Sequence, residues 1–189
     1  MEVWIVIVLS IAVCISLCCF SCCGYNAIWR KRVTSRADAM SQIIETPQGP
    51  VEVSVKGKAP YMLAFYGTPS IHDGVYGIFN EFEEAGFGII CPSRPGYGRT
   101  PLSSGKTYNE QPDLYAAMLD KLGIDKVVVH SISGGGPSAY SFARQYPDRC
   151  YCLLPECSVS GNLNHVKLTS LYKWHIRFAA TSVASANAT

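Results

Sequence analysis

Charge of either sign is scarce in this chain of 189 residues: 16% of the residues are charged, and the formal net charge is +2 at pH 7. Four of the 16 basic residues fall in the short stretch 30–36. Setting aside those four and Glu2 leaves 12 basic and 13 acidic residues for the remainder of the chain. A domain so close to neutral lacks the basic surface that binding to nucleic acid requires, so no nucleic-acid partner is expected.

Residues 3–23, VWIVIVLSIAVCISLCCFSCC, carry no charge at all. A helix of this length spans the roughly 30 Å hydrocarbon core of a bilayer. We therefore predict a single-pass transmembrane anchor at 1–24, in contact with lipid through 3–23, and a basic juxtamembrane linker at 25–42. A cleaved signal peptide is the alternative, but its first residues should be basic, whereas this chain has Glu2. The basic cluster at 30–32 follows the span, so the positive-inside rule predicts a cytoplasmic domain.

The cysteine spacing of a zinc site is missing from the predicted domain. Five of the nine cysteines lie in or at the edge of the span, and the other four are Cys91, Cys150, Cys152 and Cys157. None of these four forms a C-x-x-C pair, so we expect no metal site and no cofactor. Two interpretations of the membrane cysteines stay open: small apolar residues that pack in lipid, or reversible palmitoylation of Cys22 and Cys23 at the cytoplasmic boundary.

Beyond the anchor, strand-like and helix-like segments alternate without internal repeats. Strands are predicted at 51–57, 61–67, 87–91, 125–131 and 150–154, and helices at 74–86, 112–123 and 134–147. The turn-rich stretch TPQGP at 46–50 could join the first strand to an earlier one as a hairpin. Strand and helix alternating at this spacing predict an α/β fold with a mostly parallel sheet and helices on both faces.

A serine stands at the corner between a strand and a helix in the sequence SISGG, residues 131–135. This context fits the G-x-S-x-G nucleophile elbow, in which a sharp turn needs small residues two positions before and after the serine. Ser131 and Gly135 are both small. The Ser133 hydroxyl would then project above the carboxyl end of the sheet, and the N–H of Gly134 would point toward a developing oxyanion. A serine that caps the helix is the alternative.

Three segments together resemble the α/β-hydrolase fold enzymes of the esterase, lipase and epoxide-hydrolase type. The segment ISGGGPSAYSFARQYPDR (132–149) resembles the elbow and its helix, FGIICPSRPGYGRT (87–100) resembles a strand with its loop, and FYGTP (65–69) resembles the oxyanion loop. The chain departs from the family at Ser93, where Asp is usual, and at Tyr66, where His is usual. The order of the three motifs is far more specific than any one of them.

The resemblance, from about residue 50 to about residue 160, implies a role for several residues. Ser133 would be the nucleophile that attacks an acyl carbonyl, and the backbone N–H groups of Thr68 and Gly134 would form the oxyanion hole. A serine nucleophile favours ester, thioester or amide substrates over epoxides. Three residues of the loop after the predicted strand at 87–91 are interpreted as loop-stabilising rather than substrate-binding: Arg94, Tyr97 and Arg99.

The catalytic acid and base of the family should follow the serine in the chain, in the order Asp or Glu, then His. His72 and His130 precede Ser133, so chain order argues against both. His165 and His175 follow it, but their segment resembles the start of the family's helical cap. Glu156, at the end of a predicted strand, is a candidate for the acid.

The resemblance also divides the chain into a partial hydrolase core at 43–161 and the start of a helical cap at 162–189. It implies further strands, so we expect the C-terminal strands of the fold to be missing from these 189 residues. Two functional classes remain open. The first is a membrane-anchored serine hydrolase with a truncated chain that turns over acyl substrates poorly. The second is a catalytically inactive, hydrolase-like binding module.

Overall fold

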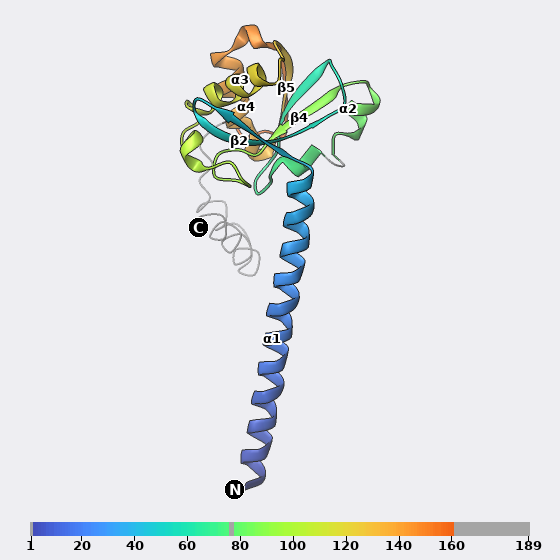
Figure 1. Ribbon diagram of the computed structural model, residues 1–189, viewed down its shortest axis with the longest axis vertical. Helices are drawn as coiled ribbons and strands as arrows, with labels where there is room; N and C mark the ends of the chain where they lie inside the picture. Colours follow the sequence, from blue (N-terminus) through green and yellow to red (C-terminus); the bar gives the residue numbers. More distant parts are fainter. Residues whose placement is uncertain (1, 76–77, 161–189) are drawn as a thin grey trace. The chain divides into compact units, whose positions relative to one another are not determined.

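The computed structural model describes residues 2–75 and 78–160 of the chain. They form two units that divide between Met40 and Ser41. The first unit is one long helix, α1 (Glu2–Ala39), and the second is an α/β unit built on a six-stranded sheet (Figure 1). The predicted cap at 162–189 lies outside the described residues.

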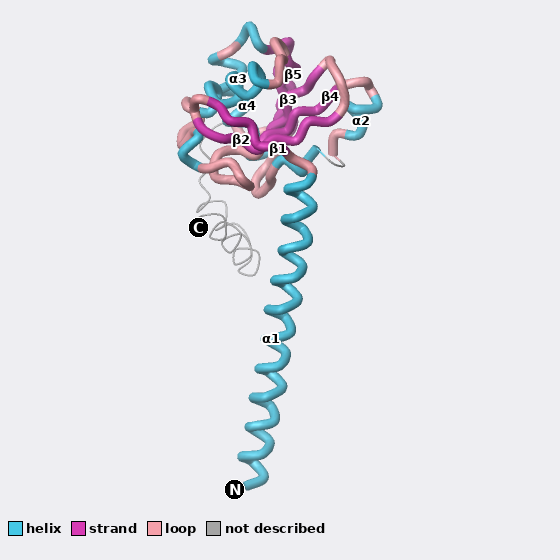
Figure 2. Tube along the Cα trace, in the orientation of Figure 1, coloured by secondary structure: helices cyan, strands magenta, loops and turns pink. Residues whose placement is uncertain are grey.

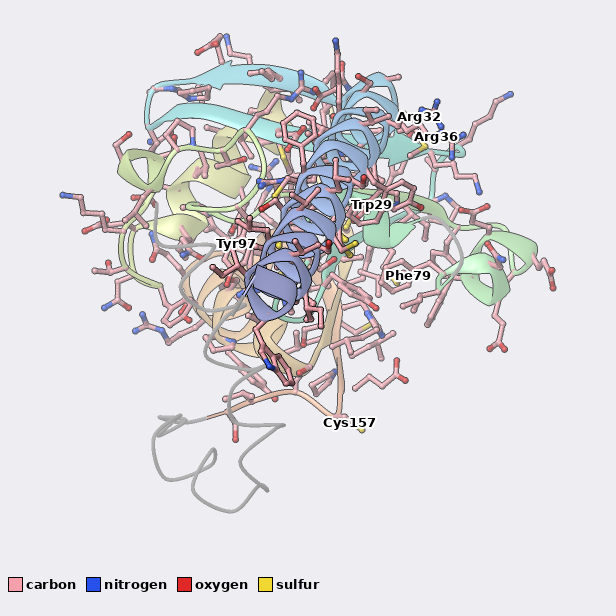
Figure 3. The ribbon with its side chains drawn as sticks, turned by 90° about the horizontal axis from the view of Figure 1, so that it is seen from below. Trp29, Arg32, Arg36, Phe79, Tyr97 and Cys157 are labelled. Atoms are coloured by element: carbon pink, nitrogen blue, oxygen red, sulfur yellow. The ribbon has the colours of Figure 1, made fainter. Side chains whose placement is uncertain are left out.

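Helix α1 is 38 residues long and strongly apolar, with a mean hydropathy of 2.8 in its candidate membrane span. It is long and apolar enough to cross a membrane. The helix does not end at residue 24, because the basic segment predicted as a linker is helical as far as Ala39. This segment has no proline, and its Arg and Lys residues favour the helix. Arg32 and Arg36, labelled in Figure 3, stand one helical turn apart near its end.

The sheet of the second unit is mixed rather than mostly parallel. Its strands are β1 (Gln42–Thr46), β2 (Gly49–Lys56), β3 (Tyr61–Phe65), β4 (Gly88–Pro92), β5 (Val127–Ile132) and β6 (Cys150–Glu156). They lie in the order β1-β2-β4-β3-β5-β6. The strands are drawn in magenta in Figure 2. The β4-β3, β3-β5 and β5-β6 pairs are parallel, but β1-β2 and β2-β4 are antiparallel. The predicted hairpin at TPQGP is confirmed. It joins β1 to β2, and the antiparallel pairing of these two strands makes the sheet more mixed than predicted.

Helices cover both faces of this sheet, as predicted. Helices α3 (Gln111–Lys121) and α4 (Gly136–Gln145) lie together on one face, and the short α2 (Asn80–Glu84) lies on the other (Figure 1). Alternate side chains of β3 pack into two different hydrophobic cores, one on each face of the sheet. Leu63 and Phe65 join the large core beneath α3 and α4, whereas Met62 and Ala64 pack with Phe79 on the α2 face.

The predicted helix at 74–86 is mostly not formed. The structure has a 3-10 turn at His72–Val75 and the five residues of α2. Two glycines, at positions 74 and 77, interrupt this stretch, and glycine is a poor helix former. Phe79 is fully buried although it precedes α2, whereas its neighbour Ile78 is 48% exposed. Gly86 ends the segment with a φ of +91°, as expected for a helix C-terminus.

Candidate active site

The turn after β5 holds Ser133 in a backbone conformation that non-glycine residues rarely adopt. Its φ is +50°, in the left-handed region. Ser133 follows the extended Ile132 and begins the 3-10 turn Ser133–Gly135, which leads into α4. Such strain persists only where the surrounding structure enforces it, and it concentrates at functional sites. This strand-turn-helix geometry is the one that the nucleophile elbow requires.

The small residues that flank the corner are packed tightly. A Cβ at Gly135 would overlap the carbonyl oxygen of Phe65, at the end of β3, so only glycine fits. Ser131 is fully buried, and its hydroxyl shares a hydrogen bond of 2.7 Å with the hydroxyl of Ser158. The N–H of Val159 donates to the carbonyl of Ser133 at 2.9 Å. The segment after β6 is therefore hydrogen-bonded to the elbow through Ser158 and Val159.

The loop after β3 lies directly against the serine corner. A Cβ at Gly67 would come within 3.1 Å of the Ser133 Cβ and 3.6 Å of its Oγ. A Cβ at Gly134 would come within 3.2 Å of the Thr68 backbone nitrogen. The structure thus brings together Ser133, Thr68 and Gly134, the three residues to which the family resemblance gives roles in one site.

Arg94 connects the loop after β3 to the serine corner. Its Nη1 donates to the carbonyl of Gly134 at 2.8 Å, and its Nη2 donates to the Thr68 hydroxyl at 2.8 Å and to the Gly67 carbonyl at 3.3 Å. The side chain is only 5% exposed, and its guanidinium lies 4.8 Å from the ring centroid of Tyr97. These contacts are those of a loop-stabilising residue, which is the role that the sequence analysis gave to Arg94.

A buried carboxylate behind the loops, Glu52 on β2, was missed by the sequence analysis. It is 1% exposed and accepts hydrogen bonds from the side chains of Ser41, Ser93 and Arg99 and from the Arg99 backbone, at 2.7 to 2.9 Å. Burial raises the pKa of Glu52, but the His72 ring and these hydrogen bonds outweigh burial and hold the pKa well below its usual range. The sequence offers one signal: an acidic residue in the middle of an apolar strand, VEVSV.

Neither described histidine is bonded to Ser133. His72 is fully buried, shares a hydrogen bond of 2.6 Å with the Ser54 hydroxyl, and lies with its Nε2 3.4 Å from Glu52. His165 and His175, which the sequence analysis considered, lie outside the described residues.

His130 packs on the α2 face, beside the rings of Phe79 and Phe82, and its Nε2 lies 3.3 Å from the carboxylate of Glu156. Burial lowers the pKa of His130, and the opposing effect of Glu156 does not cancel it. Glu156, the candidate acid, therefore contacts His130 on β5 in the part of the chain that the structure describes. Across residues 2–75 and 78–160, no three Asp, Glu, His or Cys side chains gather in a way that could hold a metal ion.

Comparison with known proteins finds hydrolases that are similar to this chain. An uncharacterized hydrolase of Bacillus subtilis, YcgS, is 40% identical over 112 residues, which are 59% of this chain and 39% of that protein. A 2-hydroxy-6-oxo-6-phenylhexa-2,4-dienoate hydrolase of Burkholderia cepacia is 38% identical over 73 residues, 36% of this chain and 24% of that one. An α/β hydrolase fold protein from Nakamurella multipartita superposes with a TM-score of 0.60 at 35% identity, covering 68% of this chain and 47% of that one.

The chain thus spans less than half the length of the relatives that it matches. The sequence profile of the alpha/beta hydrolase fold matches residues 60–173. This stretch includes the loop after β3, the loop of Arg94 and the serine corner. Because the match covers more than half of the chain, the chain belongs to the alpha/beta hydrolase fold family.

Proposed function

We propose that the protein is a membrane-anchored serine hydrolase that acts on a carboxylic ester or a related acyl substrate. The family makes a hydrolase the expected activity. The observation that carries the finer proposal is the left-handed φ of Ser133, in close contact with the loop of Gly67 and Thr68. The strain at the serine is functional if this corner exposes a nucleophile.

The proposed reaction begins when Ser133 Oγ attacks the acyl carbonyl and forms a tetrahedral intermediate. The N–H groups of Thr68 and Gly134 would stabilise its oxyanion, and each such donor is worth on the order of 10² to 10³ in rate. The bond to the leaving group then breaks, and the leaving group departs with the proton that Ser133 lost. Water then hydrolyses the acyl-enzyme to the carboxylic acid and restores the Ser133 hydroxyl. The base that takes the serine proton is not among the described histidines, because both make their contacts elsewhere.

The anchor is part of the same proposal. The uncharged residues 3–23 are long enough to cross a bilayer, and the basic cluster that follows them favours a cytoplasmic hydrolase unit. A long apolar helix near an N-terminus is also found in signal sequences, so retention in the membrane and orientation each need a test of their own.

A catalytically inactive, hydrolase-like binding module is the second candidate. The observation in its favour is that His72 and His130 are bonded to other side chains and not to Ser133. A serine without a base is a weak nucleophile.

The decisive experiment is labelling of the purified chain in detergent with a fluorophosphonate, followed by mass spectrometry of the modified peptide. We expect slow labelling at Ser133 and none in Ser133→Ala, with little turnover of short p-nitrophenyl esters. Ser160→Ala is the matched control, because Ser160 is exposed and lies only one residue beyond Val159, which contacts the elbow. Absence of an adduct at Ser133 would favour the binding module.

A further inference from the structure

The interior of the hydrolase unit holds a carboxylate that the proposed reaction does not use. Glu52 lies on β2, behind the two loops that meet at the site, and only 1% of it is exposed. Burying a charge without partners is costly, so a carboxylate at this depth needs several donors. The donors that it has belong to the loops of the site and to the segment before β1.

The first connection runs to the end of the oxyanion loop. Ser93 Oγ donates to Glu52 Oε2 at 2.9 Å and accepts the backbone N–H of His72 at 3.1 Å. Ser54, two residues along β2, shares a hydrogen bond of 2.6 Å with the His72 ring. Both ends of the segment 66–72 are thereby held, one by this relay and the other by Arg94.

The second connection fixes the loop that carries Arg94. The Arg99 backbone N–H donates to Glu52 Oε2 at 2.9 Å, and its Nε donates to Oε1 at 2.7 Å. The Glu52 backbone N–H donates to Thr100 Oγ1 at 2.9 Å, and the Ser93 N–H donates to the Glu52 carbonyl at 2.8 Å. Gly98 has a φ of +55°, and a Cβ there would overlap the carboxylate, so the loop lies directly against it.

We propose that Glu52 is a positioning residue for the oxyanion hole, because its carboxylate fixes the loops 66–72 and 93–100 against each other and so sets the place of Thr68. This inference rests on the proposed function for its effect on chemistry. The part that concerns loop geometry rests on the hydrogen bonds alone.

An ionised carboxylate suits this place because four hydrogen bonds from N–H and O–H donors of Ser41, Ser93 and Arg99 end on its two oxygens. Glutamine keeps one acceptor oxygen but turns an NH₂ group toward the donors, and alanine removes both acceptor oxygens. A carboxylate placed at position 93 could accept from the remaining donors, those of Arg99 and Ser41, since Ser93 Oγ is only 2.9 Å from Glu52 Oε2. Two carboxylates there at once would repel each other.

The test is a cycle of four variants of the full chain in detergent: Glu52→Ala, Glu52→Gln, Ser93→Asp and the double variant Glu52→Ala with Ser93→Asp. Glu45→Ala is the matched control, an acidic residue on β1 that is exposed. We expect Glu52→Ala and Ser93→Asp each to slow fluorophosphonate labelling of Ser133 by about tenfold, since a small misplacement at a reacting centre can cost up to about 10²-fold. The double variant should recover to within about threefold of the wild type.

Hydrogen exchange gives a readout that needs no reactivity. In Glu52→Ala and Glu52→Gln, amides of 66–72 and 93–100 should exchange at least about tenfold faster, while those of β5 and α4 stay as protected as in the control. The double variant should restore the protection.

The outcomes separate the two proposals. Faster exchange confined to the two loops and restored in the double variant, in a chain that is never labelled at Ser133, would support the positioning role and contradict the hydrolase. Exchange that rises equally in β5 and α4, or a double variant worse than either single one, would show that Glu52 only stabilises the fold, and the positioning role would be wrong.

Discussion

A side chain has no room at Gly135, although the backbone there would allow one. Its φ is −76°, an ordinary helical value, but a Cβ would overlap the carbonyl oxygen of Phe65. The constraint is therefore one of space and comes from the close approach of α4 to the end of β3. Gly123 shows the opposite case, with a φ of +69° and nothing within 4 Å of an added Cβ.

Gly135→Ala should therefore destabilise the unit more than Gly123→Ala. Overpacking against backbone that cannot move away costs roughly 1–3 kcal/mol or more, whereas a non-glycine residue in the left-handed region costs roughly 1–2 kcal/mol. Chemical denaturation of both variants measures the difference. Equal losses would mean that the close contact between Gly135 and Phe65 is absent in solution.

His130 makes stability depend on pH in a defined direction. Burial lowers its folded-state pKa, so below its ordinary pKa of 6.5 the unfolded chain binds a proton that the folded chain resists. The contribution of His130 to stability is then present above pH 6.5 and is lost as the pH falls from 6.5 toward the lowered value. Between pH 7.5 and 5.5 the loss amounts to up to about 1 kcal/mol.

His130→Phe should make the free energy of unfolding depend less on pH between 7.5 and 5.5, because phenylalanine does not titrate. Glu156→Gln should make this dependence steeper, since the carboxylate raises the pKa of His130 and its removal lowers that pKa further. Urea midpoints at the two pH values measure both effects. A wild-type curve that rises toward pH 5.5 would contradict the assignment of a neutral, buried His130.

Strand β6 lies at the edge of the sheet, and among the described residues its only partner strand is β5. Tyr151 is 64% exposed and Leu154 is 41% exposed. Figure 3 labels Cys157 directly after this strand, and its side chain is exposed as well. An edge with apolar side chains and unpaired backbone groups is a template for pairing with another chain.

We expect residues 37–189, expressed alone, to self-associate through β6. Tyr151→Lys should reduce the association, because charge on an edge strand opposes pairing. Tyr108→Lys is the matched control, since Tyr108 is also exposed, at 48%, but lies in a loop. Sedimentation velocity compares the two variants, and a monodisperse wild-type fragment would show that the edge is covered.

At the scale of the whole molecule, the chain joins a long apolar helix to a hydrolase unit. We expect the full chain to remain in the membrane fraction after carbonate extraction and its hydrolase unit to be digested when protease is added to the cytoplasmic side of intact vesicles. The reason is the uncharged span 3–23 followed by the basic cluster at 30–32.

The opposite orientation predicts a different result. The sequence NAT at 187–189 is an N-glycosylation acceptor by pattern. A glycan on Asn187, or protection of the hydrolase unit from the added protease, would place this unit in the lumen. Release from the membrane by carbonate would contradict the anchor itself.

The amino-acid sequence by itself predicted the features that depend on local pattern. The period-two and continuous apolar runs predicted the strands, and the turn chemistry of TPQGP predicted the hairpin of β1 and β2. The small residues around Ser133 predicted the serine corner, and the resemblance to the family through the motif at 65–69 implied that Thr68 and Gly134 share a site with Ser133. These patterns are readable because each is set by neighbours in the chain or by a motif with a fixed geometry.

The tertiary structure alone decided what depends on contacts between distant residues. Glu52 and Arg99 are 47 positions apart, and Arg94 and Gly134 are 40 apart, so no local pattern pairs them. The partner of Glu156 likewise proved to be His130, because β5 and β6 lie side by side in the sheet. A buried charge is stable only where the fold brings donors to it, and the order of the strands, which no single segment contains, determines which donors arrive.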